Sequence, residues 1–258
     1  MDLGITGESA LCVASSRGLG LGCASALAQA GCRVVINGRD RETAERASRA
    51  LGGVPFVLAD LAKPEERARL HGEAKRHLGH ISILVTNADG PPTGKFTEKS
   101  LEDWRGAFEQ SMLSAVDLAL RVVPEMMAKG WGRIVNIGSI STKEPTRNTP
   151  LSNGVKTGLV GALATLAREV AGSGVTVNNI LPGPFDTDLM WRVATALLDK
   201  PGMTKEDAMR GYLAHVPVGR LGTIEEFGAL CAFLCSRKAG FITGQSIVID
   251  GGLVGTIM

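Results

Sequence analysis

The residues with the clearest chemical potential form a short loop near the start of the chain. That loop is Ser15-Ser16-Arg17-Gly18-Leu19-Gly20. It follows a run of apolar residues and precedes a longer amphipathic stretch, so it is placed to connect a strand to a helix. Glycines and small side chains at such a connection let backbone N–H groups and the positive end of the helix approach a pyrophosphate. We expect dinucleotide binding here, with an ordinary tight turn as the alternative, because the loop departs from Gly-x-Gly-x-x-Gly.

A second group with binding chemistry closes the next apolar run, Asn37-Gly38-Arg39. In dinucleotide-binding sheets an acidic residue at this place holds the ribose 2′-hydroxyl, whereas an arginine accepts a 2′-phosphate. The sequence has Arg39 there, and Arg17 in the glycine loop can approach the same phosphate from the other side. We therefore expect NADP as the cofactor. NAD is the alternative, because a shifted register would put Asp40 near the hydroxyl.

The elements that must position these loops alternate along the chain. Short runs rich in Val and Ile are followed by longer amphipathic stretches, which is the pattern of βαβ units. We expect strands at 10–14, 33–37, 54–58, 81–86, 133–137, 175–180 and 246–249. We expect helices at 19–30, 41–51, 64–78, 101–129, 151–171 and 224–234, the fourth of them bent or interrupted at Pro124. Strands this continuously apolar belong to a parallel sheet covered on both faces. The predicted fold class is therefore α/β, a doubly wound Rossmann sheet in a single domain over residues 1–258.

The alternation stops between residues 183 and 218, where prolines and glycines surround an amphipathic piece at 188–198. A long irregular insertion late in an α/β domain is typical of a segment that covers the substrate. We expect residues 183–218 to form a substrate lid.

Composition argues against several classes of partner and site. Lys and Arg number 28 and Asp and Glu 26, a net charge of +2 without long runs of one sign, which disfavours nucleic acid as a partner. The start of the chain lacks a basic, apolar signal segment and the apolar runs are too short to cross a bilayer, so we expect a cytoplasmic protein without membrane contacts. The 5 cysteines are an odd number without a Cys-x-x-Cys pair, which favours reduced thiols over disulfides or zinc. We predict no metal site.

Seven segments together resemble the short-chain dehydrogenase/reductase family, over essentially the whole chain. They are VASSRGLG, Asp60-Leu61, Asn87-Ala88, GRIVNIGSIS, Lys156, Pro182-Gly183 and GRLGTIEEFGALCAFLCSRKAGFITGQSIVIDGG. The resemblance is strongest to 3-oxoacyl-(acyl carrier protein) reductases and their relatives, which are usually homotetramers, and it implies a homotetramer here. It also implies that Asp60 contacts the adenine and that Thr187 holds the nicotinamide amide. The other residues expected to line the cofactor are Leu61, Asn87, Ala88 and the rest of the segment 87–90, Pro182 and Gly183.

The four catalytic groups of this family are only half present. The resemblance implies a serine that orients the carbonyl group and a lysine that binds the nicotinamide ribose, and Ser139 and Lys156 fill these places. The proton-donating tyrosine is replaced by Ser152, and the asparagine that supports a water relay is replaced by Ser111. An alkyl hydroxyl is a far weaker acid than a phenol, and losing a positioned general acid typically lowers the rate by about 10²–10⁴-fold.

Two further departures lie in the nucleotide-binding part of the chain. Ala14 stands where the loop of the family has its first glycine, and Asp89 replaces the glycine of the Asn-Ala-Gly signature. The remaining glycines of the loop, Gly18 and Gly20, match the family.

Three routes remain open for the missing proton. Ser152 and Lys156 are one helical turn apart, so Lys156 can protonate a substrate oxygen through a water held by Ser152. Tyr212, the one tyrosine of the chain, lies in the expected lid and can swing inward. In the third route the substrate supplies its own proton.

The function expected from these residues is NADPH-dependent oxidoreduction of a small carbonyl or alcohol substrate, with an altered proton path. Its catalytic residues are Ser139, Lys156 and Ser152. The alternative is a non-catalytic NADP-binding sensor or scaffold, because the binding loop is kept while two catalytic groups are lost. A hydrolase in which Lys156 activates Ser152 is disfavoured, because the known motif is Ser-x-x-Lys and its other elements are absent.

Overall fold

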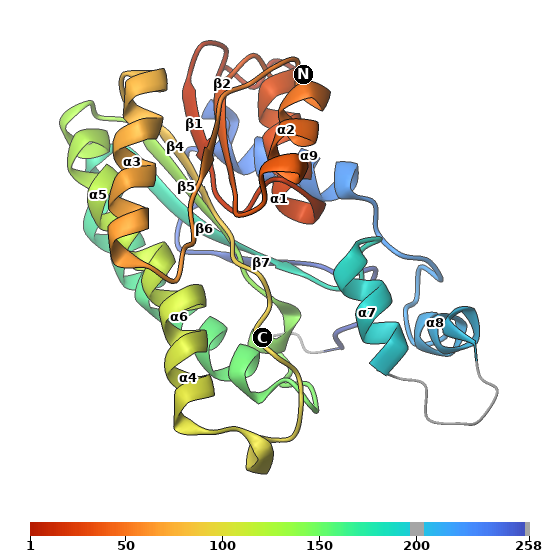
Figure 1. Cartoon of the computed structure of the whole chain (residues 1–258). Coiled ribbons are helices and arrows are strands. Elements are labelled where there is room, and N and C mark those ends of the chain that lie inside the picture. The colour runs from red at the N-terminus through yellow and green to blue at the C-terminus, as the bar shows by residue number, and fades with distance from the viewer. Residues whose placement is uncertain (197–203, 256–258) are drawn as a thin grey trace.

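The computed structural model describes residues 1–196 and 204–255. Within them, seven strands form one sheet, in the order β3-β2-β1-β4-β5-β6-β7 (Figure 1). The strands are β1 Ser9–Cys12, β2 Arg33–Gly38, β3 Phe56–Leu58, β4 Ile83–Thr86, β5 Gly132–Ile137, β6 Val175–Pro182 and β7 Ser246–Ile249. Every neighbouring pair in the sheet is parallel. The predicted doubly wound α/β fold is confirmed, with a strand at each of the expected positions.

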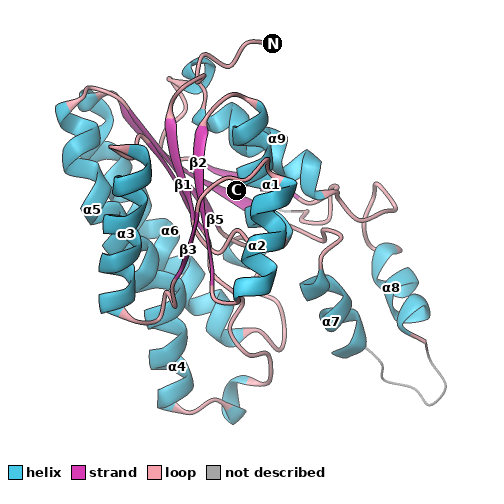
Figure 2. Cartoon of the chain, turned by 45° about the horizontal axis from the view of Figure 1, so that its top comes forward, coloured by secondary structure: helices cyan, strands magenta, loops and turns pink. Residues whose placement is uncertain are grey.

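Helices cover both faces of the sheet, as Figure 2 shows. They are α1 Gly18–Gln29, α2 Arg41–Ala50, α3 Pro64–Leu78, α4 Leu101–Phe108, α5 Ser114–Ala128, α6 Pro150–Val170, α7 Asp188–Ala196, α8 Lys205–Leu213 and α9 Ile224–Cys235. One apolar core lies between the sheet and α3, α5 and α6, with Leu70, Leu118 and Leu163 at its centre. A second core lies on the other face under α1, α2 and α9, and contains Leu27 and Phe227. Because both faces are covered, every residue of β1, β4 and β5 is buried.

The helix that follows the glycine loop is held by an unusually close crossing of α1 and α9. A Cβ atom added at Gly22 would lie 2.4 Å from the carbonyl oxygen of Ile224, and one added at Gly228 would lie 2.3 Å from that of Gly22. Only glycine fits at both positions, because real Cβ atoms do not approach backbone oxygens so closely. The backbone contact fixes α1, and with it the loop at its start, against the C-terminal part of the chain.

The long helix expected over 101–129 is interrupted, but not at Pro124. It consists of α4, a π-helical turn at Glu109–Leu113, and α5, which continues through Pro124. The interruption expected at Pro124 is therefore wrong. Proline cannot bond the carbonyl group of Leu120, but Leu120 is 66% exposed, so water can reach that turn of the helix. The π turn lies where the carboxylate of Glu109 binds the buried Arg67 of α3 at 2.8 Å.

The region expected to be a lid contains two helices, α7 and α8, which extend away from the main body (Figure 1). The amphipathic piece noted at 188–198 contains helix α7, and residues 197 and 198 lie outside the described part of the chain. Helix α8 was not predicted. Its start has a sequence signal, since Thr204 accepts a hydrogen bond from the backbone of Asp207 and the Asp207 carboxylate accepts one from the backbone of Thr204. No helix in the described ranges is long and apolar enough to span a membrane.

The crossing of α1 and α9 makes a testable prediction about stability. Gly22→Ala is expected to lower the free energy of unfolding by about 1–3 kcal/mol, because its methyl group would overlap the backbone of α9. The matched control is Gly72→Ala on α3, where a Cβ atom meets nothing within 4 Å. That change is expected to raise stability by about 0.5–1 kcal/mol through helix propensity. Urea denaturation measures both, and a Gly22→Ala protein as stable as the Gly72→Ala protein would contradict the packing argument.

Candidate active site

The predicted site residues come together at the edge of the sheet where its parallel strands end. The strand order reverses direction between β1 and β4, which is the point where α/β sheets bind ligands. The glycine loop follows β1 and Asn87 follows β4. Their contact is direct, because the Asn87 side-chain amide donates a 3.0 Å hydrogen bond to the carbonyl oxygen of Ala14.

The glycine loop has the geometry that a phosphate group requires. A Cβ atom at Gly20 would lie 2.5 Å from the carbonyl oxygen of Ala14, and Gly18 has a positive φ of 55°, so both positions call for glycine. Helix α1 begins without a side chain that caps it, whereas Asp40 caps α2 by accepting a 2.8 Å hydrogen bond from the backbone of Thr43. Its first N–H groups are therefore available to an anion, and the loop fits a dinucleotide pyrophosphate.

The side chain of Asn37 holds the glycine loop through a hydrogen bond, a role that the sequence analysis did not predict. Its side chain is buried, its oxygen accepts a 3.0 Å hydrogen bond from the backbone of Ala14, and its nitrogen donates to the carbonyl oxygens of Val57 at 3.1 Å and Ala59 at 3.2 Å. Ser15, an expected cofactor contact, is also fully buried; its hydroxyl donates to the carbonyl of Cys12 and accepts from the backbone of Asn37. The Ser15 side chain thus belongs to the support of the loop.

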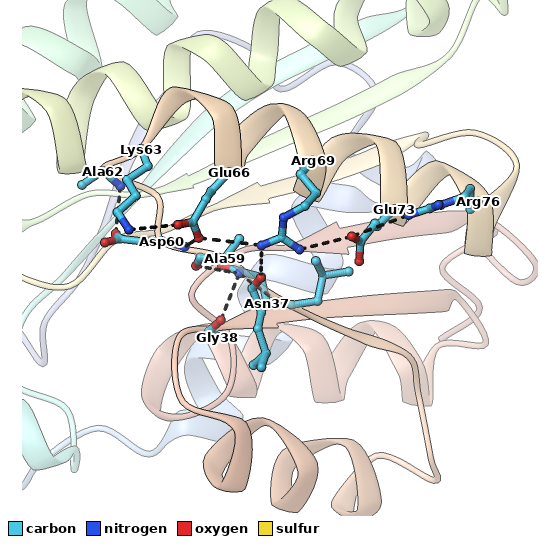
Figure 3. A network of polar contacts seen from close by, with 12 residues as sticks. Asn37, Gly38, Ala59, Asp60, Ala62, Lys63, Glu66, Arg69, Glu73 and Arg76 are labelled. Atoms are coloured by element: carbon cyan, nitrogen blue, oxygen red, sulfur yellow. Dashed lines mark hydrogen bonds and ion pairs between the residues drawn. The ribbon is translucent and has the colours of Figure 1, made fainter.

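The expected adenine contact, Asp60, lies in the loop after β3 (Figure 3), followed by Leu61, which was expected to line the cofactor. The backbone N–H of Asp60 donates a 2.7 Å hydrogen bond to Glu66 on α3, and the Asp60 carboxylate accepts one from the backbone of Ala62. The bond from Asp60, followed by the bond from Lys63, keeps the pKa of Glu66 below its usual range. The carbonyl oxygen of Leu61 accepts from buried Arg67 at 2.8 Å. The loop is therefore held through its backbone.

Two arginines converge at the outer end of the same edge. Arg17 and Arg39 both form ion pairs with Asp89, at 3.7 Å in the case of Arg17. Asp40, considered above as a ribose contact in a shifted register, is committed to capping α2 through Thr43. The predicted pair of arginines is thus placed to hold an anion.

At the other end of the edge, Lys156 lies over the strand that leads to Ser139. From α6 its ammonium group donates to the carbonyl oxygens of Ile137 at 3.2 Å and Gly138 at 3.3 Å. Burial lowers the pKa of Lys156 from 10.5 to about 8. The Ser139 hydroxyl accepts a 3.1 Å hydrogen bond from the backbone of Ser141 and starts the 3₁₀ turn Ile140–Thr142. The structure therefore places the ammonium group of Lys156 at the two backbone carbonyl groups that directly precede the expected carbonyl-binding serine.

The two serines that replace the tyrosine and asparagine lie on neighbouring elements. Ser152 is partly buried in the first turn of α6, one turn before Lys156. Ser111 is buried in the π turn, which packs against α6, and its hydroxyl has no hydrogen-bond partner among the described residues. A buried hydroxyl without a protein partner is a place for water.

The residues expected near the nicotinamide bring the start of the lid to the glycine loop. A Cβ atom on Gly18 would lie 3.7 Å from the methyl group of Thr187, so these two expected contacts are neighbours. Gly183 follows Pro182 at the end of β6, and a Cβ atom there would lie 2.4 Å from the Cβ of Asp250. Close packing thus leads the chain out of β6 toward α7.

Tyr212, one of the three expected proton routes, lies elsewhere. It lies on α8 and packs in one cluster with Met190 of α7 and with Met209 and Leu213 of α8. Figure 1 shows α8 on the far side of α7 from α6. Burial, followed by the charge of Asp250, raises the pKa of its phenol, which makes it a weaker acid. The structure thus does not bring Tyr212 to Ser139 and Lys156. A cavity of about 460 Å³ between α7 and α8 contains Trp191 and Met209 in its lining and none of the strand-end residues.

The cysteines and other potential ligands form no metal centre in the described ranges. Groups of three or more His, Cys, Asp or Glu residues with ligand geometry are absent there. The five cysteines are free and buried, and burial raises the thiol pKa values of Cys12, Cys23 and Cys32. They pack as small apolar side chains in the core under α1 and α9.

Comparison with known proteins agrees with this arrangement. The family model described as "Enoyl-(Acyl carrier protein) reductase" matches residues 13–254. The chain is 31% identical to 2,3-dihydroxy-2,3-dihydro-p-cumate dehydrogenase of Pseudomonas putida over 255 residues, covering 97% of this chain and 95% of that protein. It is 32% identical to 3-oxoacyl-(acyl-carrier-protein) reductase of Escherichia coli over 248 residues, covering 96% and 97%. The solved structure of L-sorbose reductase from Gluconobacter frateurii, complexed with NADPH and L-sorbose, superposes with a TM-score of 0.94 at 32% identity, with 100% of both chains covered.

The conformation of Ala14 makes a prediction about the loop. Its φ of 46° lies in the left-handed region, which costs a residue with a Cβ atom about 1–2 kcal/mol. Ala14→Gly is therefore expected to stabilise the protein by about 0.5–1 kcal/mol, after the greater entropy of unfolded glycine is counted. Ala24→Gly, in the middle of α1, is the matched control and is expected to destabilise. Equilibrium unfolding of both variants measures these changes. An Ala14→Gly protein less stable than the wild type would contradict the claim that the backbone of Ala14 is strained.

Proposed function

The chain belongs to the short-chain dehydrogenase/reductase family, and from this premise we propose that it is an NADP-dependent oxidoreductase that interconverts a small carbonyl compound and its alcohol. The observation that carries the proposal is the placement of Lys156, with a pKa of about 8, over the strand end that bears Ser139. The same sheet edge carries the glycine loop. In this proposal residues 1–258 are one nucleotide-binding domain, and 183–218 is its substrate lid.

The proposed cofactor contacts run along the strand ends from the arginines to the lid. Arg17 and Arg39 hold the 2′-phosphate, because a guanidinium pair with one anion between them suits that group. The start of α1 holds the pyrophosphate. L-sorbose reductase, which has the same fold over the whole chain, was solved with NADPH bound. The remaining proposed contacts are Ser16, Gly18, Leu19, Gly20, Asp60, Leu61, Asn87, Ala88, Pro182, Gly183 and Thr187. Ser15 supports the loop and is not among them, because its hydroxyl and its backbone N–H are both bonded inside the protein.

The proposed proton path passes through Lys156. Bound NADPH supplies the hydride to the carbonyl carbon, and the Ser139 hydroxyl donates a hydrogen bond to the carbonyl oxygen. The charged Lys156 donates its proton to that oxygen through a water molecule held by Ser152, one turn away on α6. The unpartnered hydroxyl of Ser111, in the π turn that packs against α6, binds a further water of this path. This path delivers a proton to the carbonyl oxygen without a tyrosine hydroxyl.

The second candidate function, a sensor or scaffold that binds NADP without turnover, is favoured by the loss of two catalytic groups beside an intact glycine loop. It predicts tight NADPH binding and no carbonyl-dependent oxidation of NADPH. A panel of acyl thioesters, ketones, quinones and sugars separates the two, and binding without turnover on all of them would overturn the enzyme proposal.

We propose that the protein acts as a homotetramer in the cytoplasm. Large apolar side chains remain exposed on the single chain, among them Phe108 on α4, Leu120 on α5 and Phe241 just before the edge strand β7. Contact between copies would cover such surfaces. The buried free cysteines suit a reducing compartment.

The pKa of Lys156 predicts the pH dependence of the reaction. Reduction needs the protonated amine, so kcat/KM for carbonyl reduction is expected to be constant below about pH 7 and to fall about tenfold per pH unit above the pKa of about 8. Alcohol oxidation needs the neutral amine and is expected to rise over the same range. Steady-state rates from pH 6 to pH 10 test this, and a rate that stays level up to pH 10 would exclude Lys156 as the donor.

Lys156→Arg provides a sharper form of the same test. Arginine keeps the charge but does not release a proton in this range, so kcat is expected to fall by about 10²–10⁴-fold while NADPH still binds, and the change near pH 8 is expected to disappear. Lys238→Arg, on the exposed 3₁₀ turn Arg237–Ala239, is the control and should keep both rate and profile.

Restoring the phenol tests whether the site still performs carbonyl chemistry. Ser152→Tyr is expected to raise the reductase rate by about 10²-fold or more, because a tyrosine beside Lys156 can donate a proton directly. Ser152→Phe places the same ring without the hydroxyl group and should give no gain. Equal rates for the Tyr and Phe variants would indicate that the site has lost the reaction and would favour the sensor.

A further inference from the structure

The ion pairs around Asp89 join three loops that are distant in sequence. Arg17 follows β1, Arg39 follows β2 and Asp89 follows β4, and these three strands are consecutive in the sheet. Both guanidinium groups contact the single carboxylate, each through a different oxygen. The side chains are 40–54% exposed, so the cluster is open to a ligand from solvent.

The position of the carboxylate matches the position that the proposed function assigns to the 2′-phosphate. Two arginines that would clamp a phosphate instead hold an anion supplied by the chain itself. A phosphate that enters between them must displace Asp89 or lie beside it, and two like charges at that distance repel. A cofactor without the 2′-phosphate meets no such repulsion, and a carboxylate near the ribose can accept a hydrogen bond from the 2′-hydroxyl.

We propose that Asp89 determines the cofactor preference of this protein, by competing with the 2′-phosphate of NADP for Arg17 and Arg39. This competition reduces the difference in binding affinity between NADP and NAD. The inference rests on the proposed function, which assigns the two arginines to that phosphate. It makes Asp89 a specificity-determining residue of the adenosine end, separate from Ser139 and Lys156.

A second acidic residue beside the arginines allows a matched comparison. Asp40 directly follows Arg39, but its carboxylate caps α2 and accepts hydrogen bonds from the backbone and hydroxyl groups of Thr43. Asparagine caps a helix about as well as aspartate, so Asp40→Asn removes the same charge from the same region without breaking an ion pair of Arg39. Any difference between Asp89→Asn and Asp40→Asn therefore reports the direct contact.

The experiment measures the Kd values of NADPH and NADH for the wild type, Asp89→Asn and Asp40→Asn, by fluorescence titration of the full-length protein at low and at physiological salt. Asp89→Asn is expected to tighten NADPH binding about tenfold and to leave NADH unchanged or weaker. Asp40→Asn should change the ratio of the two Kd values less than about threefold. In an Arg39→Ala background the effect of Asp89→Asn is expected to shrink, because one of the two competed groups is gone.

The outcomes separate this inference from the proposed function. If the wild type binds NADPH and reduces carbonyl compounds but Asp89→Asn leaves the NADPH to NADH ratio unchanged, or changes it only as much as Asp40→Asn does, the inference is wrong and the function stands. If the wild type does not bind NADPH but Asp89→Asn does, the inference is supported and the NADP assignment of the natural chain fails. If neither protein binds NADPH, both are overturned.

Discussion

The buried amide of Asn37 is the interaction on which the nucleotide-binding edge depends. Parallel strands end at one edge, but nothing in the ladder itself holds the loops that follow them. Asn37 lies next to last in β2 and bonds the backbone of Ala14 after β1 and of Ala59 after β3, so one side chain ties the loops after both neighbouring strands to β2. A buried amide left without partners would destabilise the fold, so the hydrogen bonds of the Asn37 side chain are expected to form or break together. The strained φ of Ala14 persists because its N–H and carbonyl group are both held, by Asn37 and Asn87.

At the other end of the edge, packing determines the chemistry. Helix α6 packs on β6 and brings the ammonium group of Lys156 to the carbonyl oxygens of Ile137, at the end of β5, and of Gly138, in a partly buried place. Carbonyl oxygens bond the charged form, but desolvation is the stronger effect and lowers the pKa. A phenol with a pKa near 10 would need help to donate a proton at neutral pH, whereas an amine with a pKa of about 8 exchanges its proton there directly. In the proposed function, the burial of Lys156 by the fold is therefore what makes its amine an acid at neutral pH.

The fold was predictable because its signal is repeated. Each βαβ unit has a continuously apolar strand and an amphipathic helix, and a mistake of two residues at one boundary changes neither the order nor the class. The interruption of the helix at 101–128 was not predictable in the same way, because it depends on Glu109 meeting Arg67 across 42 residues of sequence. Asn37 was visible only as a polar residue at a strand end, and Asp89 only as a departure from a signature. Their partners lie on other strands, so their roles follow from tertiary contacts that no local pattern contains.

The retained and replaced residues differ in how much room surrounds them. At Gly20, Gly22 and Gly183 an added Cβ atom would lie within 2.5 Å of another atom of the chain, so replacing any of these glycines would disturb the fold. Ser152, by contrast, is only partly buried. Retention of the glycines therefore says little about turnover, since a sensor needs them equally. Lys156 is more informative. Burying its amine destabilises the charged form, and binding ribose hydroxyls needs a hydrogen-bond donor at any pKa, whereas proton transfer near neutral pH needs a pKa close to 8. The lowered pKa of Lys156 is therefore a property that the proposed enzyme would use and that a sensor would not need.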